Sequence, residues 1–511
     1  MKGEARLDIL VVGDEAAGPG VVKGLEENGL RAVRADVPVP RRREGALPVL
    51  SELSGCFGTY EAGLRAGEGP RRRPVRGGIV VQAGRREAAF EPLELEPGDR
   101  VVTLSAFLEA LPGLPRPETG DRAPLAVFLL GLGGESSPRA TREALSAAAV
   151  LLEDLGWRAA LLYGNLKVSG AGLEAAVRDA RRKGALLLRF SGGRPTFVRQ
   201  GEGRVAVDCL DESSRSRLTL HPDWIVVDEA LRAGPEERER AERVGADPGP
   251  DGFLPSDNVY RFGLETNRRG ILALPPGADP LGRETLEDDL AAAALEMRAL
   301  ERFESREPDR AAVIDPGLCA RCLTCYRACP HGAVAVGERV EIVTRACFAC
   351  GVCEGACPAR AIALQGPGRG EGPGEAPRDP ERPHIRPGDL VVFGCRRSAD
   401  RARALCRHLG EEPPGDLEFV PVDCAGCISR QTIMDALLAG ASGVLVLACH
   451  PGNCHAERGN LEARSRVEAV RRFLQEAGMD PGRAGFHTLA ANMGVEYGRT
   501  VRAFREALDR G

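Results

Sequence analysis

Eight cysteines between residues 319 and 357 form two runs with the same internal spacing. The two runs are Cys319, Cys322, Cys325 and Cys329, followed by Cys347, Cys350, Cys353 and Cys357. A proline, Pro330 or Pro358, follows the last cysteine of each run. This CxxCxxCxxxCP spacing is typical of paired 4Fe–4S clusters, because three thiolates of a run wrap around one cluster and the fourth reaches the other. The spacing therefore predicts two 4Fe–4S clusters.

The crossed pattern assigns each fourth cysteine to the opposite cluster. The thiolates expected at one cluster are Cys319, Cys322, Cys325 and Cys357, and those expected at the other are Cys347, Cys350, Cys353 and Cys329. The alternatives are zinc ligation and unligated core cysteines, but zinc sites use pairs of cysteines separated by longer gaps. Residues 310–363 accordingly resemble a bacterial two-cluster ferredoxin, and we expect that fold here.

Four further cysteines follow apolar runs in the C-terminal part of the chain. They are Cys395, Cys424 and Cys449, each after such a run, and Cys454, in the same loop as Cys449. Because the carboxyl ends of parallel strands share one edge of an open α/β sheet, we expect these four thiolates to lie together. Such a group can bind a 2Fe–2S cluster. The alternative is a set of small buried residues in a core.

Other potential ligands lie in the same region. Cys427 is a spare candidate for the 2Fe–2S site, whereas Cys406 falls in an expected helix, where we expect a structural role. His450 and His455 lie in or beside the loop between Cys449 and Cys454. We expect these histidines beside the cluster or on the surface, with metal ligation as the alternative.

Composition narrows the class of protein further. The 511-residue chain has 16 cysteines, 14 of them after residue 318, and this distribution favours metal ligation over disulfides. The net charge of −5 and the aromatic content of 4% provide neither a basic field nor stacking platforms for nucleic acid. The N-terminus lacks the apolar core of a signal peptide, and no window of about 18 apolar residues is free of charge. We therefore expect a cytoplasmic protein without a membrane span.

Apolar strands alternate with helical segments in both halves of the chain, which predicts α/β domains with parallel sheets. Residues 1–304 should form a Rossmann-type dinucleotide-binding domain, with a second α/β unit inserted at about residues 123–225. Residues 205–228 indicate an antiparallel meander, and residues 286–304 indicate one long helix. The expected order continues with the ferredoxin module at 310–363, a Gly/Pro-rich linker at 364–388 and an open α/β domain at 389–511.

The C-terminal region, residues 389–508, resembles the delta subunit of methyl-viologen-reducing hydrogenase. The resemblance rests on residues 422–426, 440–446 and 449–455, together with the pair at 459–460. It implies a 2Fe–2S electron-transfer domain. One feature of the family is absent, because its first site usually has a CxxC pair, whereas residues 395–398 here read Cys-Arg-Arg-Ser.

Residues 7–304 resemble the flavoprotein part of the A-type subunit of heterodisulfide reductase. The matching stretches are residues 78–84, 161–165, 185–190 and 265–271. A fusion of all three parts is similar to the B-type subunit of the quinone-interacting membrane-bound oxidoreductase. The resemblance implies an FAD- and NAD-type domain and, as partners, other oxidoreductase subunits. These would be a hydrogenase, a formate dehydrogenase, a heterodisulfide reductase-like subunit or a quinone-linked module that makes the chain membrane-peripheral.

The FAD fingerprint expected after the first strand is incomplete. A dinucleotide-binding turn needs glycine where its backbone approaches the diphosphate. Gly13 and Gly18 are in place, and Asp36 stands where an acidic residue would bind the ribose, but Glu15 replaces the second glycine. The cluster-binding cysteines of the family are also missing near the second α/β unit, where residues 135–139 stand instead. We expect FAD to bind weakly or not at all, leaving the N-terminal half as a docking platform.

These features favour an iron–sulfur electron-transfer subunit of an oxidoreductase complex, which relays single electrons between the 2Fe–2S site and the two 4Fe–4S clusters. No catalytic residue is assigned, since the sequence has no GxSxG, HExxH or P-loop motif. Two alternatives stay open. One is an FAD-dependent oxidoreductase that converts hydride from NAD(P)H or a thiol donor into single electrons, and the other is a redox sensor.

Overall fold

The computed structural model describes most of residues 8–510. The internal segments outside this description are residues 14–17, 38–47, 67–68, 89, 91–94, 99, 119–121, 132–135, 167, 169–171, 191–193, 201–203, 213, 255–257, 262, 275–282, 305–309, 366–384 and 412–416. Of residues 283–287 and 300–304 only the backbone is described. The expected linker at 364–388 therefore lies largely outside the described residues. Within the described part, no helix is both long enough and apolar enough to span a bilayer.

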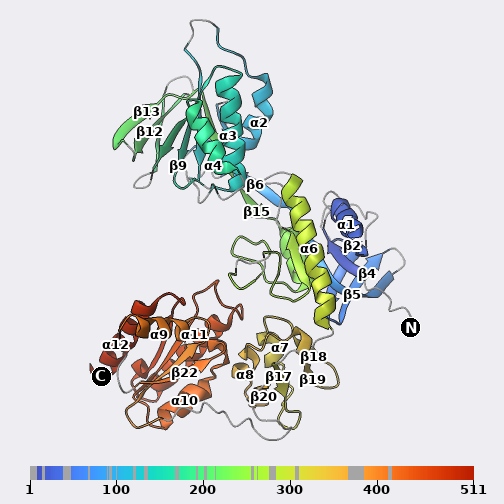
Figure 1. Cartoon of the computed structure of the whole chain (residues 1–511), viewed down its shortest axis with the longest axis vertical. Coiled ribbons are helices and arrows are strands. Elements are labelled where there is room, and N and C mark those ends of the chain that lie inside the picture. Colours follow the sequence, from blue (N-terminus) through green and yellow to red (C-terminus); the bar gives the residue numbers. More distant parts are fainter. Residues whose placement is uncertain are drawn as a thin grey trace.

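The first sheet is built around β1 (Asp8–Val12), an apolar strand that is buried along its whole length. A strand of this kind needs neighbours on both edges, and β1 pairs in parallel with β2 (Ala32–Ala35) and β5 (Gly69–Val81). The remaining strands are β3 (Val49–Ser54), β4 (Tyr60–Ala66) and β16 (Ile271–Leu274). The order is β2-β1-β5-β4-β3, with β16 also paired to β5. Helices α1 (Gly18–Glu27) and α6 (Arg283–Glu304) lie against each other beside the sheet (Figure 1). The Rossmann-type fold expected for this half is confirmed.

The second sheet is entirely parallel, with the order β10-β9-β8-β14-β7. Its strands are β7 (Val101–Thr103), β8 (Leu125–Leu130), β9 (Arg158–Tyr163), β10 (Leu186–Arg189) and β14 (Trp224–Val227). Its helices are α2 (Leu104–Ala110), α3 (Pro138–Glu153) and α4 (Leu173–Arg182). A small antiparallel sheet consists of β11 (Thr196–Arg199), β12 (Val205–Asp211) and β13 (Ser216–Leu220).

The prediction of an antiparallel meander at residues 205–228 is wrong for the last strand, β14. Strands β12 and β13 are antiparallel as expected, but β14 pairs in parallel with both β7 and β8. The physical reason is that Ile225, Val226 and Val227 are all buried, as in parallel strands that are covered on both faces. Local alternation of apolar and polar residues cannot distinguish such a strand from the edge of a meander.

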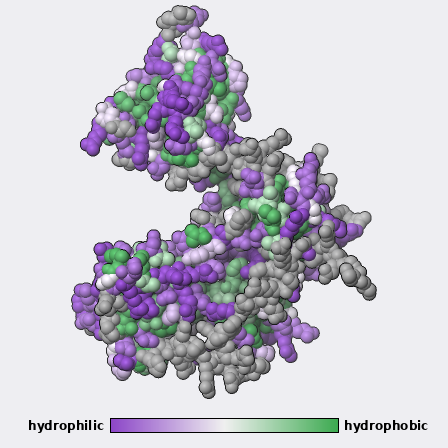
Figure 2. Space-filling view, viewed as in Figure 1, coloured by the Kyte–Doolittle hydropathy of each residue, from purple (hydrophilic) through white to green (hydrophobic). Residues whose placement is uncertain are grey.

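An antiparallel strand pair, β6 (Gly84–Ala88) and β15 (Glu229–Ala233), lies between the two sheets, and α5 (Pro235–Val244) follows it. Figure 1 shows the second sheet projecting from the rest of the molecule beyond this pair. Figure 2 shows a wide indentation between this lobe and the C-terminal domain, with hydrophilic residues covering much of the face in view.

The short elements between residues 311 and 365 form two related halves. Strand β17 (Ala311–Ile314) pairs with β20 (Ile362–Gln365), and β18 (Val334–Val336) pairs with β19 (Val340–Ile342). Helices α7 (Thr324–Ala328) and α8 (Val352–Ala356) contact each other. Left-handed backbone occurs at matching positions of the two cysteine runs, namely Arg321 and Ala349, Leu323 and Gly351, and Gly332 and Arg360. Residues other than glycine adopt this conformation at a cost of about 1–3 kcal/mol each, so the turns around the cysteines are imposed by their surroundings.

The C-terminal domain is an open parallel sheet with the order β22-β21-β23-β24, as expected. Its strands are β21 (Leu390–Cys395), β22 (Leu417–Val422), β23 (Gly443–Ala448) and β24 (Ala484–Thr488). Alternate residues of β21 face opposite sides, because Val391 and Phe393 pack toward α10 (Arg430–Leu438) and α11 (Gly459–Glu476). Leu390 and Val392 pack toward α9 (Ala399–His408) and α12 (Gly494–Arg510).

A buried ion pair ties the first sheet to α5. The carboxylate of Asp36 lies just after β2, and its Oδ1 is 3.2 Å from Nη2 of Arg240. The Arg240 side chain is only 4% exposed and also pairs with Glu237. One cation therefore forms ion pairs with two buried carboxylates.

Replacing Arg240 with methionine should remove one cation from beside two buried carboxylates. Removal of one partner of a buried ion pair costs about 3–5 kcal/mol, so we expect a loss of this size in the free energy of unfolding of the first sheet. Amide hydrogen exchange in β1 and β2 measures it. Arg238→Met, at an exposed position of the same helix, is the control. Equal effects of the two variants would contradict a role for the buried pair.

Candidate metal centres

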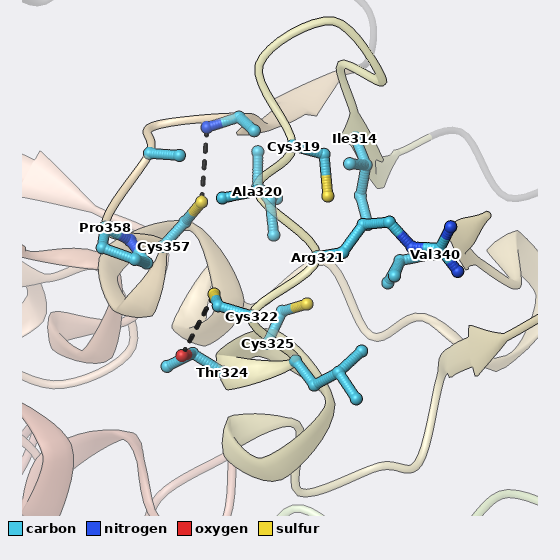
Figure 3. Close-up of a pocket in the computed structure, with 14 residues that line it drawn as sticks. Ile314, Cys319, Ala320, Arg321, Cys322, Thr324, Cys325, Val340, Cys357 and Pro358 are labelled. Atoms are coloured by element: carbon cyan, nitrogen blue, oxygen red, sulfur yellow. Dashed lines mark hydrogen bonds between the residues drawn. The ribbon is translucent and has the colours of Figure 1, made fainter.

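The structure separates the eight clustered cysteines into two groups, each around its own cavity. The first cavity is lined by Cys319, Cys322, Cys325 and Cys357, and the second by Cys329, Cys347, Cys350 and Cys353. Figure 3 shows the first group, with apolar side chains such as Ile314 and Val340 beside the sulfurs. The last cysteine of each run thus lies with the other run. This is the grouping expected from the spacing, and the role of these thiols as ligands stays a prediction.

Backbone N–H groups point at the sulfurs in both halves of the module. Ala361 N donates to Cys357 Sγ at 3.3 Å (Figure 3), and Ala333 N donates to Cys329 Sγ at 3.4 Å, with the same offset along the chain. Cys347 Sγ accepts from two further amides, at 3.5 and 3.4 Å. Hydrogen bonds to sulfur stabilise negative charge and tune the reduction potential of a cluster. The donor set, the apolar lining and these amides fit 4Fe–4S clusters.

The two cavities differ in their access to solvent. Cys322 is exposed, and a hydrogen bond with Thr324 lowers its pKa. In the second cavity, burial raises the pKa of Cys350 to about 12 and also raises that of Cys353. The first cavity therefore includes one exposed thiol, whereas none of the four thiols at the second cavity is exposed.

The four C-terminal cysteines meet at one edge of their sheet. Cys395 ends β21, while Cys424 and Cys449 follow β22 and β23 closely. With Cys454, they are all at most 5% exposed. Their sulfurs form two pairs, Cys395–Cys449 at 3.6 Å and Cys424–Cys454 at 4.0 Å.

These sulfur separations suit two tetrahedral metal ions. Two thiolates on one tetrahedral ion, with metal–sulfur bonds of about 2.3 Å, lie about 3.8 Å apart. The two pairs therefore fit a 2Fe–2S cluster with two cysteines on each iron. Across the residues that the structure describes, no three His, Cys, Asp or Glu side chains form a group arranged to hold one metal ion.

Mutual hydrogen bonds lower the pKa of two of these four thiols. Hydrogen bonds with Cys424 and Cys449 lower the pKa of Cys454, and a hydrogen bond with Cys449 lowers the pKa of Cys395. The hydrogen bond with Cys395 raises the pKa of Cys449. A metal ion binds the deprotonated thiolate, so the hydrogen bonds that lower the pKa of Cys395 and Cys454 favour the form that it requires.

Close backbone packing and two amide side chains hold this site. A Cβ atom at Gly459 would lie only 2.4 Å from Cys424 Sγ, so no larger residue fits there. Asn460 Nδ2 donates to the carbonyl of Cys449 at 3.0 Å. Asn258 Nδ2 donates to the carbonyl of Cys454 at 2.8 Å, although it belongs to the N-terminal half of the chain. Sequence reasoning missed Asn258, because no local pattern signals a contact across so long a separation.

The remaining candidates lie outside the sulfur groups. Cys427 lies at the end of the short turn η5 (Ala425–Cys427), where it faces Gly351 of the ferredoxin module. Cys406 is buried on α9 and hydrogen-bonds to the carbonyl of Glu411. His450 binds Thr488 and Met493 through its two ring nitrogens, while the His455 ring lies 5.6 Å from that of Tyr260.

The residues expected to bind FAD are only partly described. Gly13 packs against Val81 of β5, where a Cβ atom would come within 2.8 Å, and Gly18 begins α1. Glu15 lies in the segment 14–17, outside the described residues. The carboxylate of Asp36 accepts a hydrogen bond from Val37 N and pairs with Arg240. Asp36 is thus engaged within the protein instead of facing an open ribose site.

A Gly459→Ala variant should lose any metal held by the four C-terminal cysteines, because the added methyl group overlaps Cys424 Sγ. The two cysteine groups of the ferredoxin module should keep their metal. Iron content and EPR spectra of the anaerobically purified protein measure both effects. The matched control is Gly20→Ala, also in the first turn of a helix, where a Cβ atom meets no atom of the described residues within 4 Å. Full iron content in the Gly459 variant would rule out this close packing.

Comparison with known proteins matches each part of the chain. Residues 390–510 match the family "Methyl-viologen-reducing hydrogenase, delta subunit", and residues 311–358 match "4Fe-4S dicluster domain". The D-type vhu iron-sulfur subunit of the F420-non-reducing hydrogenase of Methanopyrus kandleri is 30% identical over 121 residues, which are 24% of this chain and 89% of that subunit.

The N-terminal half has a more distant relative. The A-type subunit of the ferredoxin:CoB-CoM heterodisulfide reductase of Methanosarcina mazei is 24% identical over 325 residues, 63% of this chain. The matched region covers only 41% of that relative. The solved thioredoxin reductase of T. acidophilum overlaps 58% of this chain, with a TM-score of 0.35 and 11% identity. Through residues 390–510, the chain belongs to the family of methyl-viologen-reducing hydrogenase delta subunits, joined here to a 4Fe–4S dicluster domain and to a region related to the A-type subunit of heterodisulfide reductase.

Proposed function

We propose that this chain is an iron–sulfur electron-transfer subunit of a heterodisulfide reductase/hydrogenase-type complex. The two cysteine groups of the ferredoxin module would hold two 4Fe–4S clusters, and Cys395, Cys424, Cys449 and Cys454 would hold a 2Fe–2S cluster. When bound, the clusters supply one-electron transfer. The residues of the chain position the clusters and stabilise their charge.

One observation carries this proposal: the four C-terminal cysteines pack directly against the second cavity of the ferredoxin module. They share a buried apolar cluster with Val352 of α8, and Cys350 and Ala328 pack against that cluster. Cys350 itself lines the second cavity. The sites therefore follow one another in space, from the buried C-terminal group through the second cavity to the exposed first cavity.

Contacts across the chain support the N-terminal half as a docking platform. Asn267 Nδ2 donates to the carbonyl of Pro330 at 2.7 Å, and Arg269 donates to the carbonyl of Arg345 at 2.6 Å. Arg261 and Glu457 form an ion pair of 3.1 Å in which each side chain is only 9% exposed. The stretch 258–269 thus touches both metal-binding domains. The N-terminal half would then serve the packing of the cysteine modules.

The partner would be another oxidoreductase subunit, since a relay needs both a donor and an acceptor. Matched relatives are named as subunits of hydrogenase and of heterodisulfide reductase. A hydrogenase, a heterodisulfide reductase-like subunit, a formate dehydrogenase or a quinone-linked module would each supply a suitable redox centre. The proposal places the chain in the cytoplasm, where thiols stay reduced. The exposed edge near Cys322 is the surface through which the partner would exchange electrons.

We expect about ten iron atoms per chain, because two 4Fe–4S clusters and one 2Fe–2S cluster add up to that number. Cys454→Ser should lower the iron content by about two and spare both 4Fe–4S signals. In the fully reduced protein, the C-terminal and second clusters should broaden each other's EPR signals, since their ligands are in contact. This broadening should vanish in the variant.

The control for this variant is Cys406→Ser, which changes a buried cysteine of the same domain that lies in α9, outside the sulfur group. It should keep all the iron. About eight iron atoms in the unmodified protein would remove the C-terminal cluster from the proposal, on the same cluster arithmetic. Unbroadened EPR signals in a protein with its full iron content would contradict the proposed electron transfer between the C-terminal cluster and the second 4Fe–4S cluster.

The flavin content of the anaerobically purified protein should be far below one FAD per chain. The reasons are the acidic replacement in the fingerprint turn and the engagement of Asp36 by Arg240. Flavin fluorescence after denaturation measures it. Near-stoichiometric FAD would support the FAD-dependent oxidoreductase instead. Flavin that appears only in a Glu15→Gly variant would show that the turn is where binding was lost.

A further inference from the structure

A single buried guanidinium, that of Arg466 on α11, lies at the contact between the second cavity and the C-terminal site. Arg466 is 8% exposed. Its Nη1 donates to the carbonyls of Gly426 and Ile428, the latter at 3.2 Å. Its Nη2 reaches the carbonyl of Val352, on α8 of the ferredoxin module, at 3.4 Å. One cation therefore binds the backbone of both modules.

Glycines bring the backbone close to this cation. A Cβ atom at Gly355 would lie 2.4 Å from Arg466 Nη1, and one at Gly426 would lie 2.9 Å from Cγ2 of Val352. Helix α8 and the turn η5 can therefore close around the guanidinium only because these positions have no side chain. The geometry is that of a built site for the cation.

The charge of Arg466 acts on Cys424 of the C-terminal group, and its hydrogen bond to Val352 places it at the helix that carries Cys353 of the second cavity. Val352, whose carbonyl it binds, packs in the same buried cluster as Cys424 and Cys350. Glu462 Oε2 lies 3.3 Å from Nη2, but that side chain is 41% exposed, so solvent weakens its opposing charge. Arg430 also faces this region. Charges within a buried contact are screened much less than those at the surface.

We propose that Arg466 is a positioning residue that stabilises the reduced states of the C-terminal cluster and of the second 4Fe–4S cluster together. Reduction adds one electron, and hence one negative charge, to a cluster. A buried cation nearby favours the more negative state of each and so raises both reduction potentials. This inference rests on the proposed function, and it adds the residue that adjusts the reduction potentials of the two adjacent clusters.

The test is an EPR-monitored redox titration of the full anaerobic protein. Arg466→Met should lower the reduced-to-oxidised ratio of both clusters about tenfold at a fixed potential, which is about 59 mV for a one-electron couple. The cluster at the exposed first cavity should shift less. Arg466→Lys should restore part of the change. Glu462→Gln, which removes the opposing charge, should shift both clusters in the opposite direction.

Arg471→Met is the matched control, because Arg471 is exposed on the same helix. Unchanged potentials in Arg466→Met with full iron content would overturn the inference, as would shifts of the same sign in Arg466→Met and Glu462→Gln. If Arg466→Met loses iron, Arg466→Gln, a polar side chain without the charge, decides: lowered potentials of both clusters support the inference, and unchanged ones overturn it. Absence of the C-terminal cluster from the unmodified protein would instead refute the proposed function.

Discussion

The burial of sulfur next to sulfur is the constraint on which the rest of this structure depends. A buried thiolate without a partner costs several kcal/mol, because the low-dielectric interior offers little solvation. The chain meets this cost with backbone N–H donors at Cys329, Cys347 and Cys357, and with hydrogen bonds among the four C-terminal thiols. These donors can reach the sulfurs only where the backbone comes very close. The left-handed turns of the ferredoxin module and the glycine at 459 are consequences of that requirement.

The same constraint explains how the three parts of the chain meet. Side chains large enough to separate α8 from η5 would also separate the second cavity from the C-terminal site, and glycines at 355 and 426 prevent this. The gap is filled by a guanidinium, which donates to three backbone carbonyls. The N-terminal half closes the remaining side. Asn258 completes the loop of Cys454, and Arg261 neutralises Glu457 three residues further on.

Much of this could be predicted from the sequence, because its strongest signals are local. The CxxCxxCxxxCP runs dictate their own grouping, and the apolar runs before Cys395, Cys424 and Cys449 predicted both the strands and the sheet edge. What the sequence could not show depends on long separations. The local pattern of strand β14 is compatible with a meander, and only its parallel pairing with β7 and β8 distinguishes it. Asn258, Arg261 and Arg466 carry no motif, since each acts on a backbone carbonyl or carboxylate far away in the chain.

Covalent fusion gives this contact a thermodynamic advantage. The hydrogenase relative that matches the C-terminal domain aligns over most of its own length, so that relative has little chain beyond the part that corresponds to this domain. Joining the domains turns their association into an intramolecular step, which raises the effective concentration of each domain near the other. The interface can then be small and can tolerate a buried cation that a transient interface would have to desolvate at every encounter. The joined domains stay in contact with each other. The backbone contacts between them therefore fix the separation between adjacent sulfur groups. A relay benefits most from that property, since its rate depends on a fixed distance and not on the affinity between its parts.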